Sequence, residues 1–520
     1  MSRLRISPHK GTYLPSAPVR LNVSASGLSS TPVKATVSHL DRELAVLEGT
    51  LDHTGSTVLE WTSPDETPRG YGVDVTTRAD DRLLTGSTAF DVLEHWTERP
   101  RYGFLSDFPP DRDAAAVLDA LLPYHLNALQ FYDWQFRHDQ LVAPTTEYLD
   151  PFGRVLSLET IRRFIKEAGR RGMAAMAYAA VYAASLPFQM DHLSWALFDS
   201  EHQPHRFEDF LGYMNPSPGS PWVEHLIRQC WEALDQMGFD GIHLDQYGEP
   251  RKAFDATGAK VDLPASFAEF VDVLKMGRPK MPITLNAVKN WPIEQLARSR
   301  EDFYYVEVWP DTPTYEDLGR IVREARFLSS GKGVVVAVYI PAEHRCNVRL
   351  TNAVIFTNGG SRIELGEQAR LLVDPYFPNH AKLDENLATT LRGYWDLAVR
   401  YGDVLFSKLQ DERHLEVDLP PGLVATVHQG GGRVGVSLVN LNPPSHARWD
   451  LPHPPPTPIE GLQLNLRTQF QVAGATWASA DRRFPTVEKI AIEPTPDGFK
   501  ATIPRLEYWG LLCLDSEELK

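Results

Sequence analysis

The segment Gly238-Phe-Asp-Gly-Ile-His-Leu-Asp-Gln-Tyr-Gly-Glu-Pro250 decides the fold that we expect for the chain. Its apolar and polar residues alternate, so that Ile242 and Leu244 face one side of a strand while His243 and Asp245 face the other. A glycine and a proline end the strand, and a helical pattern precedes it. A strand that follows a helix and ends in a carboxylate is typical of parallel α/β proteins, which place reactive groups at the carboxyl ends of their strands.

The carboxylate of Asp245 also has an ordinary structural interpretation. An aspartate at a strand end can cap the helix that follows or form an ion pair with an arginine. From this segment alone, a catalytic and a structural role are both open for Asp245.

The same alternation of strand and helix continues on both sides of this segment. Eight candidate strands cover 102–108, 128–134, 174–184, 241–247, 281–287, 304–309, 334–340 and 354–357. Helical patterns lie between them at 114–122, 158–171, 222–237, 265–275, 293–300 and 315–328, and a closing helix is expected at 383–401. This order predicts a central (β/α)8 TIM barrel over residues 96–402. The long connection after the third strand predicts an excursion that faces the substrate.

Two β-rich regions flank the predicted barrel. Short alternating apolar runs, separated by clusters of Gly, Pro, Ser and Asp, fill residues 1–95 and return over 403–520. This pattern is typical of β-sandwiches. We therefore expect a multidomain α/β plus β protein, in which an N-terminal immunoglobulin-like β-sandwich and a C-terminal β-sandwich flank the barrel.

The composition of the 520-residue chain narrows its possible partners. Its 68 acidic residues outnumber its 52 basic residues, and a formal net charge of −16 argues against nucleic acid as a ligand. A neutral substrate fits this charge better. The three cysteines, Cys230, Cys346 and Cys513, are too far apart in sequence to predict a disulfide framework or a metal site.

No segment of the sequence predicts attachment to a membrane. The first ten residues include basic side chains but lack the apolar run of a secretory signal. The most apolar stretch, 172–187, is shorter than the ~20 residues that a membrane helix needs. The chain as written is expected to be cytoplasmic, although a secreted protein without its leader would look the same.

Polar and aromatic residues gather where the predicted strands end. The candidate substrate-binding residues at these ends are Tyr132, Asp133, Trp134, His138, Tyr178, Tyr247, Asn286, Trp309 and Asn358, and Asn215 lies in the loop before the helix of the fourth strand. Aromatic faces stack on the apolar side of sugar rings, while Asp, Asn and His bind hydroxyl groups. The sequence therefore predicts a sugar-binding pocket at this edge of the sheet.

A second carboxylate, Glu307, lies within the apolar segment Phe303-Tyr-Tyr-Val-Glu-Val-Trp309. An unpaired buried carboxylate is costly, so we expect Glu307 to be either paired or used in the reaction. Apolar surroundings should raise its pKa, which suits a proton donor, whereas Asp245 beside hydrogen-bond donors should stay ionised as a nucleophile. Two carboxylates of unequal pKa in an aromatic pocket are what glycoside cleavage requires.

Several of the candidate binding residues also have structural interpretations. Trp134, Trp309 and Tyr247 can be ordinary packing residues of the barrel, since large aromatic side chains are mostly buried. His138 can brace its loop instead of binding sugar. The sequence leaves both interpretations open for these residues.

Two other functions are alternatives to sugar cleavage. His243 and Asp245 could chelate a metal ion in a barrel hydrolase, but the first strand offers none of the additional histidines that such a site needs. His243 is better explained as a hydrogen-bonded neighbour of Asp245, and we expect no metal and no cofactor. A sugar-binding protein on an inactive barrel is the non-enzymatic alternative, which the presence of both carboxylates disfavours.

Four motifs resemble those of one known family. They are Leu129-Gln-Phe-Tyr-Asp-Trp-Gln-Phe-Arg-His138, Asp150-Pro-Phe-Gly-Arg154, the segment from Gly238 to Gly248 and Tyr305-Val-Glu-Val-Trp309. With these motifs the chain resembles glycoside hydrolase family 66, which contains endo-dextranases and cycloisomaltooligosaccharide glucanotransferases. The resemblance implies retaining cleavage of α-1,6-glucosidic bonds in dextran or isomaltooligosaccharides. It also implies that Asp245 is the nucleophile and Glu307 the acid/base.

One departure from the family bears on the reaction. Members that make cyclic products look as though they carry an extra carbohydrate-binding module late in the barrel, whereas here only 342–353 joins the seventh predicted strand to the eighth. The sequence therefore favours hydrolysis. Transglycosylation through the same intermediate is the alternative.

Overall fold

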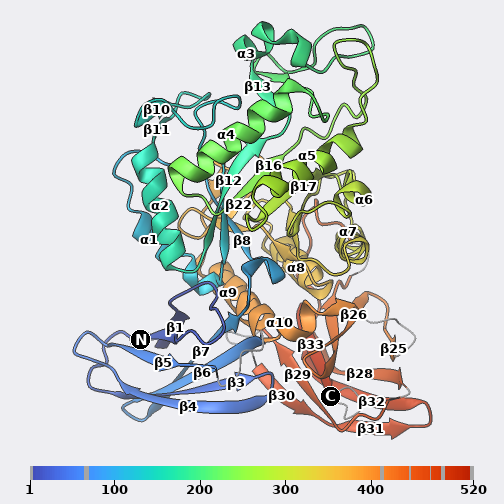
Figure 1. Cartoon of the computed structure of the whole chain (residues 1–520). Coiled ribbons are helices and arrows are strands. Elements are labelled where there is room, and N and C mark those ends of the chain that lie inside the picture. Colours follow the sequence, from blue (N-terminus) through green and yellow to red (C-terminus); the bar gives the residue numbers. More distant parts are fainter. Residues whose placement is uncertain are drawn as a thin grey trace.

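A curled, mostly parallel sheet of eleven strands runs through the middle of the protein (Figure 1). The computed structural model describes residues 4–63, 69–409, 415–443, 447–468, 470–481 and 486–515. The order across the sheet is β20 (Ser361–Arg362), β19 (Val334–Ala337), β18 (Tyr304–Glu307), β17 (Ile283–Val288), β16 (Gly241–Asp245), β12 (Ala174–Ala180), β9 (Ala128–Phe131), β8 (Tyr102–Leu105), β21 (Leu365–Gly366), β22 (Arg370–Leu372) and β23 (His380–Ala381).

The sheet curls until its two ends share one short stretch of chain. β20 pairs in parallel with β19, and β21 pairs in parallel with β8 at Gly366 and Phe104. Only Ile363 and Glu364 separate β20 from β21. Residues 361–366 therefore connect the strands at the two ends of the curled sheet, because β20 pairs with β19 and β21 pairs with β8. The first seven candidate strands are confirmed as members of this sheet, and their observed ends differ by a few residues from the predicted ones.

The eighth predicted strand, at 354–357, is wrong. These residues form the last turn of helix α8 (Arg345–Thr357), and the strand follows at Ser361. A short run such as Val-Ile-Phe-Thr is apolar on all sides whether it is a buried strand or a fully buried helical turn, so its periodicity does not separate the two. The helix ends at Asn358, before Gly359, whose φ of 78° suits glycine.

Helices cover the outside of the curled sheet. They are α1 (Ala114–Asp119), α2 (Leu158–Arg170), α4 (Pro221–Met237), α5 (Leu263–Gly277), α6 (Ile293–Leu296), α7 (Tyr315–Leu328), α8, α9 (Glu385–Arg400) and α10 (Gly402–Leu405), with 3-10 turns at Trp96–Glu98, Leu122–Tyr124 and Leu193–Trp195. The predicted range 315–328 is confirmed at both ends, whereas the helix predicted at 293–300 stops at Leu296. Gly238, at φ 86°, ends α4 and turns the chain into β16. None of the described helices has both the length and the apolar character needed to cross a membrane.

The third predicted strand is split in two. β12 ends at Ala180, and β13 (Ala183–Ser185) instead joins β15 (Leu211–Tyr213) and β14 (Arg206–Phe207) in a small separate sheet. Together with α3 (Leu186–Asp191), this sheet forms an excursion beyond the carboxyl end of β12, at the top of Figure 1. The hairpin β10 (Glu147–Leu149) and β11 (Val155–Ser157) lies on the same side.

Two antiparallel sheets built from the N-terminal residues share one core. The first contains β1 (Leu4–Pro8), β2 (Val19–Ala25) and β5 (Ser56–Trp61), and the second contains β4 (Arg42–Thr50), β3 (Pro32–His39), β6 (Arg69–Ala79) and β7 (Arg82–Val92). Alternate residues of β2 are buried, as the predicted alternation requires. Their side chains meet in a cluster that includes Val23, Val37 and Tyr71.

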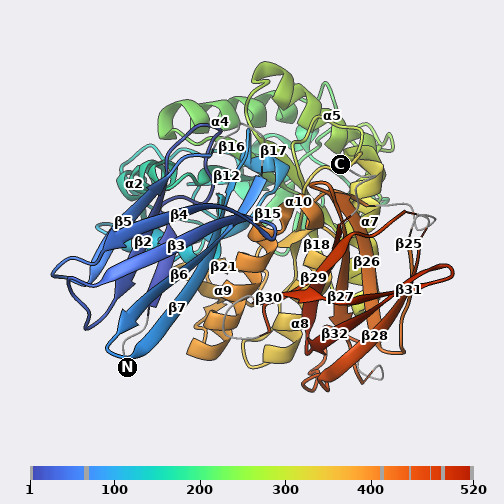
Figure 2. The same ribbon diagram turned by 90° about the horizontal axis from the view of Figure 1, so that it is seen from below.

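The C-terminal residues form two further antiparallel sheets. One contains β24 (Lys408–Leu409), β26 (Leu423–Gly430), β27 (Arg433–Asn440), β33 (Trp509–Asp515), β29 (Gly474–Ser479) and β30 (Thr486–Ile490), and the other contains β25 (Leu415–Asp418), β28 (Ile459–Thr468), β32 (Gly498–Leu506) and β31 (Ile492–Thr495). Seen from below, the N-terminal sheets (blue) and the C-terminal sheets (red) lie side by side, with α9 (orange) between them (Figure 2). Both lie at the end of the central sheet opposite to the excursion (Figure 1).

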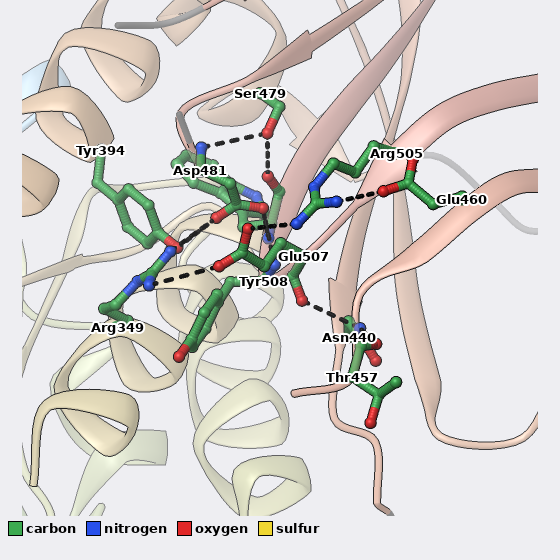
Figure 3. Close-up of polar contacts among 11 residues, drawn as sticks. Arg349, Tyr394, Asn440, Thr457, Glu460, Ser479, Asp481, Arg505, Glu507 and Tyr508 are labelled. Carbon is green, nitrogen blue, oxygen red and sulfur yellow. Dashed lines mark hydrogen bonds and ion pairs between the residues drawn. The ribbon is translucent and has the colours of Figure 1, made fainter. Parts of the chain in front are cut away.

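A buried arginine ties α8 to the C-terminal sheets (Figure 3). The guanidinium of Arg349 lies 3.4 Å from the centre of the Tyr508 ring and 3.2 Å from Asp481. Asp481 also accepts hydrogen bonds from the Tyr394 hydroxyl of α9, at 2.9 Å, and from the backbone N–H groups of Tyr508 and Trp509, at 2.7 and 3.0 Å. One carboxylate therefore joins two helices to strand β33.

Removing this carboxylate should weaken the attachment. In Asp481→Ala, Arg349 stays buried without its closest anion, and we expect the unfolding free energy to fall by about 3–5 kcal/mol, measured by urea denaturation. Glu460→Gln is the matched control, because Glu460 pairs with Arg505 in the same region but is 62% exposed, and it should leave the urea transition in place. An equal loss in both variants would contradict this role for Asp481.

Candidate functional site

Two carboxylates meet at the carboxyl ends of strands in the central sheet. Asp245 ends β16 and Glu307 ends β18, while β17 lies between these strands and carries Asn286. The Nδ2 atom of Asn286 donates to Asp245 Oδ1 at 2.8 Å and to Glu307 Oε2 at 3.0 Å. The two carboxylate oxygens that share this nitrogen are therefore less than about 6 Å apart, which is the range in which two acids act on one glycosidic bond.

Hydrogen-bond donors surround Asp245. The Tyr178 hydroxyl donates to its Oδ2 at 2.7 Å, and the Gln246 N–H donates to its Oδ1 at 2.9 Å, in addition to the bond from Asn286. Burial raises the pKa of Asp245, and these three donors oppose that effect. Because all three groups donate, they stabilise the ionised form of Asp245.

Glu307 lies in a drier place and close to a like charge. Burial, followed by the charge of Asp245, raises the pKa of Glu307 to about 7, while donor groups of Asn286, Tyr339 and Trp309 lower it. The Tyr339 hydroxyl donates to Glu307 Oε1 at 2.8 Å. A glutamic acid with a pKa near neutrality can give up and take back a proton at the working pH. The surroundings of the two acids thus differ in the charge of Asp245 that acts on Glu307, while the catalytic roles assigned from the sequence stay predictions.

The sequence analysis missed Tyr339, although its position carried a signal. Val335, Ala337 and Tyr339 alternate along β19 and its exit, so Tyr339 occupies the same face of the sheet as the other strand-end residues. Its side chain carries a hydroxyl group at the end of an apolar strand, and that strand is the neighbour of the strand that ends in Glu307.

The rings of Tyr132 and His243 both lie next to Tyr178, which donates to Asp245. The ring of Tyr132 stacks on Phe377 at 4.3 Å, and burial, followed by the charges of Asp133, Asp245 and Glu307, raises its pKa. His243 is hydrogen-bonded to the hydroxyl of Tyr102 at 3.2 Å, and burial lowers its pKa to about 3, so its ring is neutral.

A second polar cluster continues from Tyr132. Burial raises the pKa of Asp133 to about 7, and the positive charge of Arg154 opposes this. Gln135 donates to Asp133 at 3.5 Å, and its amide nitrogen lies 3.5 Å from Nε2 of His138, a buried ring whose pKa burial lowers to about 4. Asp133 has a left-handed backbone, with φ 48°, which re-aims its side chain at the end of β9. The charge of Asp245 also raises the pKa of Asp133.

Three tyrosine rings pack against one another in a further aromatic cluster. Tyr247 stacks on Tyr213 at 4.4 Å and meets the edge of Tyr182 at 4.9 Å. Tyr182 directly follows Val181, whose N–H donates to the carbonyl of Asp245 at 2.9 Å. The buried hydroxyl oxygen of Tyr247 has no hydrogen-bond partner within the described ranges.

Comparison with known proteins gives this geometry a family. A sequence model of glycosyl hydrolase family 66 matches residues 8–513. The chain belongs to glycosyl hydrolase family 66. It is 28% identical over 441 residues to a cycloisomaltooligosaccharide glucanotransferase of Niallia circulans, covering 77% of this chain and 44% of that protein. It is 23% identical over 312 residues to a dextranase of Streptococcus salivarius, covering 52% of this chain and 37% of that protein. The chain thus spans less than half the length of these curated relatives.

Solved structures show the same fold. The crystal structure of a Paenibacillus sp. cycloisomaltooligosaccharide glucanotransferase in complex with cycloisomaltoheptaose superposes with a TM-score of 0.90 at 22% identity, covering 99% of this chain and 100% of that chain. A maltogenic α-amylase, AmyB of Thermotoga neapolitana, superposes with a TM-score of 0.53 at 12% identity, covering 81% of this chain and 99% of that chain.

Two residues of this family 66 chain do not lie where the sequence analysis expected them. Trp134 was predicted to bind substrate, but its side chain is fully buried against Phe239 and donates to the carbonyl of Tyr178 at 3.1 Å. Asn358 was predicted at a strand exit, but it caps α8, accepts a hydrogen bond from Arg323 at 2.6 Å and faces the C-terminal sheet at Thr426. The alternation of residues gives the direction of a side chain but not its depth, and so it could not show that Trp134 is buried. Asn358 was misplaced because residues 354–357 are the end of α8 and not the predicted strand.

Trp309 and Asn215, two other residues predicted to bind substrate, lie in different surroundings. Trp309 is half-buried next to Tyr339, with ring centroids 6.3 Å apart, and so lies beside the residue that donates to Glu307. Asn215 accepts the N–H of Ser217 at 3.0 Å in the turn that leads to α4. Among the described residues, no group of three or more His, Cys, Asp or Glu side chains is arranged to hold a metal ion.

Proposed function

We propose that this family 66 protein is a retaining glycoside hydrolase that cleaves α-1,6-glucosidic bonds in dextran or isomaltooligosaccharides. The observation that carries the proposal is the single amide nitrogen of Asn286 bound to both Asp245 and Glu307, because it keeps the two acids within reach of one glycosidic bond. The wider separation of about 6.5–9.5 Å in inverting enzymes leaves room for a water molecule between acid and base.

The proposed first step forms a covalent intermediate. Asp245 Oδ attacks the anomeric carbon, the bond from that carbon to the glycosidic oxygen breaks, and Glu307 transfers its proton to the departing oxygen. In the second step Glu307 removes a proton from water, the oxygen of that water replaces Asp245 on the anomeric carbon, and both acids return to their starting states. Two inversions give net retention of configuration.

The proposed substrate is inferred from the relatives and from the side chains around the two acids. A dextranase and cycloisomaltooligosaccharide glucanotransferases are among the relatives, and their names refer to α-1,6-linked glucans or their cyclic oligomers. Tyr132 offers an aromatic face, and Asp133 and Asn286 offer groups that bind hydroxyls. An uncharged glucan also suits a chain with a net charge of −16. For the fold, the proposal includes a (β/α)8 barrel at 96–402 between an immunoglobulin-like β-sandwich at 1–95 and a β-sandwich at 403–520.

Transglycosylation is the second candidate, because glucanotransferases are among the relatives and cover more of this chain than the dextranase does. Hydrolysis is favoured by the short connection between β19 and α8, which holds only residues 338–344. Both reactions share the covalent intermediate and differ in whether water or a sugar hydroxyl accepts the glucosyl unit.

Product analysis tests the proposal. We expect linear isomaltooligosaccharides from dextran by mass spectrometry, and proton NMR of the first products should show the α-anomer before mutarotation. Cyclic or lengthened products would favour the transferase, and a β-anomer would refute retention.

Loss of either acid should abolish turnover. Asp245→Asn and Glu307→Gln should each lower kcat by at least about three orders of magnitude, since one lacks the nucleophile and the other the proton donor. Asp240→Asn is the matched control, because Asp240 precedes the same strand and binds the Ala175 N–H at 2.8 Å, and it should keep most of the activity. Near-normal turnover by either of the first two variants refutes the assignment.

The pH profile should follow Glu307. The first step needs Glu307 protonated, so kcat should fall as the pH rises through the Glu307 pKa of about 7. The Tyr339 hydroxyl lowers that pKa, so Tyr339→Phe should raise it and move the alkaline limb of the profile to higher pH. Tyr304→Phe, which removes a hydroxyl bound to the Leu296 carbonyl, should leave the limb in place. A shift to lower pH in Tyr339→Phe would contradict this account.

A further inference from the structure

A row of aromatic rings leads outward from the carboxylates. Tyr132 lies 6.3 Å from Tyr376, Tyr376 lies 5.0 Å from Phe152, and Phe152 lies 5.0 Å from Phe210, all between ring centroids. We call Tyr376, Phe152 and Phe210 the aromatic rim. Its three members come from three separate connections, namely those between β22 and β23, β10 and β11, and β14 and β15. Three loops far apart in sequence thus bring their aromatic residues together.

The backbone of Phe152 is hydrogen-bonded within a tight turn, while its side chain is half exposed. Its side chain is 50% exposed at the tip of the β10–β11 hairpin. Asp150 Oδ1 accepts the N–H of Phe152 at 3.0 Å and that of Arg154 at 2.7 Å, and the Arg154 side chain binds Asp150 Oδ2 at 2.7 Å and the Ser106 carbonyl at 2.7 Å. The turn is fixed by Asp150, so the hairpin does not need an aromatic residue at position 152 for its own stability. A rigid, exposed aromatic face binds a ligand with little loss of conformational entropy.

Polar groups lie along one side of the rim. The guanidinium of Arg154 is 5.9 Å from the centre of the Tyr376 ring. Burial raises the pKa of Tyr376, the charge of Arg154 lowers it, and the charges of Asp133 and Asp150 raise it further. A flat apolar face bordered by charged and hydroxyl groups matches a glucose ring, which has an apolar face and a periphery of hydroxyls.

We propose that the aromatic rim binds glucose units of the substrate that lie several residues away from the bond being cleaved, and that it gives the enzyme its preference for long chains. This inference rests on the proposed function. Tyr132 supplies the continuity, because its ring centroid lies 5.1 Å from that of Tyr178, which donates to Asp245, and 6.3 Å from that of Tyr376. That continuity favours the substrate itself over a second protein as the occupant.

Substrates of different length test the rim in Phe152→Ala. Isomaltoheptaose is compared with the shortest isomaltooligosaccharide that the wild-type protein cleaves. We expect KM for isomaltoheptaose to rise about three- to tenfold with kcat preserved, and both constants for the short substrate to stay unchanged. Phe327→Ala, which removes an 83% exposed phenylalanine from α7, should change neither substrate. Calorimetry in the Glu307→Gln background should show the same loss of affinity for isomaltoheptaose.

The outcomes separate this inference from the proposed function. If the wild-type protein cleaves α-1,6-glucans but Phe152→Ala affects both lengths equally, or neither, the aromatic rim does not bind distant glucose units and the proposed function stands. If the wild-type protein cleaves no α-1,6-glucan, the proposed function fails and the inference fails with it. If sedimentation shows that Phe152→Ala dissociates an oligomer while KM is unchanged, the rim is a protein interface and the inference is wrong.

Discussion

The site depends on one amide group placed between two buried acids. Asp245 and Glu307 repel each other when both are ionised, and burial makes both ionised forms costly. Asn286 donates to both carboxylates, and this shared donor holds the two side chains close to each other. Tyr178 and Gln246 also donate to Asp245, and Tyr339 and Trp309 are further donor groups beside Glu307. The difference is that the charge of Asp245 adds to burial in raising the pKa of Glu307. In the proposed mechanism this difference separates the acid from the nucleophile.

The parallel sheet makes this arrangement possible. β16, β17 and β18 are neighbours that run in one direction, so their last residues reach the same edge together. Behind that edge, Trp134 binds the carbonyl of Tyr178, whose hydroxyl in turn holds Asp245. The β-sheets of the two termini lie at the opposite end (Figure 1), where Arg349 and Asp481 fasten one of them to α8 and α9. Fastening at one end leaves the strand exits open at the other.

The sequence was sufficient wherever a period-two pattern determined the answer. Asp245 and Glu307 were found because strand ends in a parallel sheet converge, and this needs no knowledge of loops. The same reasoning could have found Tyr339. It failed at 354–357, where burial on all sides makes helix and strand look alike, and at Trp134, where alternation gives the direction of a side chain but not its depth. The rim was out of reach, because three irregular connections supply it and no periodicity relates them.

In the proposed mechanism, the balance between hydrolysis and transfer is decided at the anomeric carbon that is attached to Asp245. If the departing part of the substrate stays bound after cleavage, its new hydroxyl group is positioned to attack the intermediate, and water is excluded while that part remains. If the rim held the departing part of the chain, strong binding there would favour transfer; if it held the part attached to Asp245, it would select long chains and leave the competition with water unchanged. The identity of the acceptor therefore depends on groups well outside the pair of acids that breaks the bond.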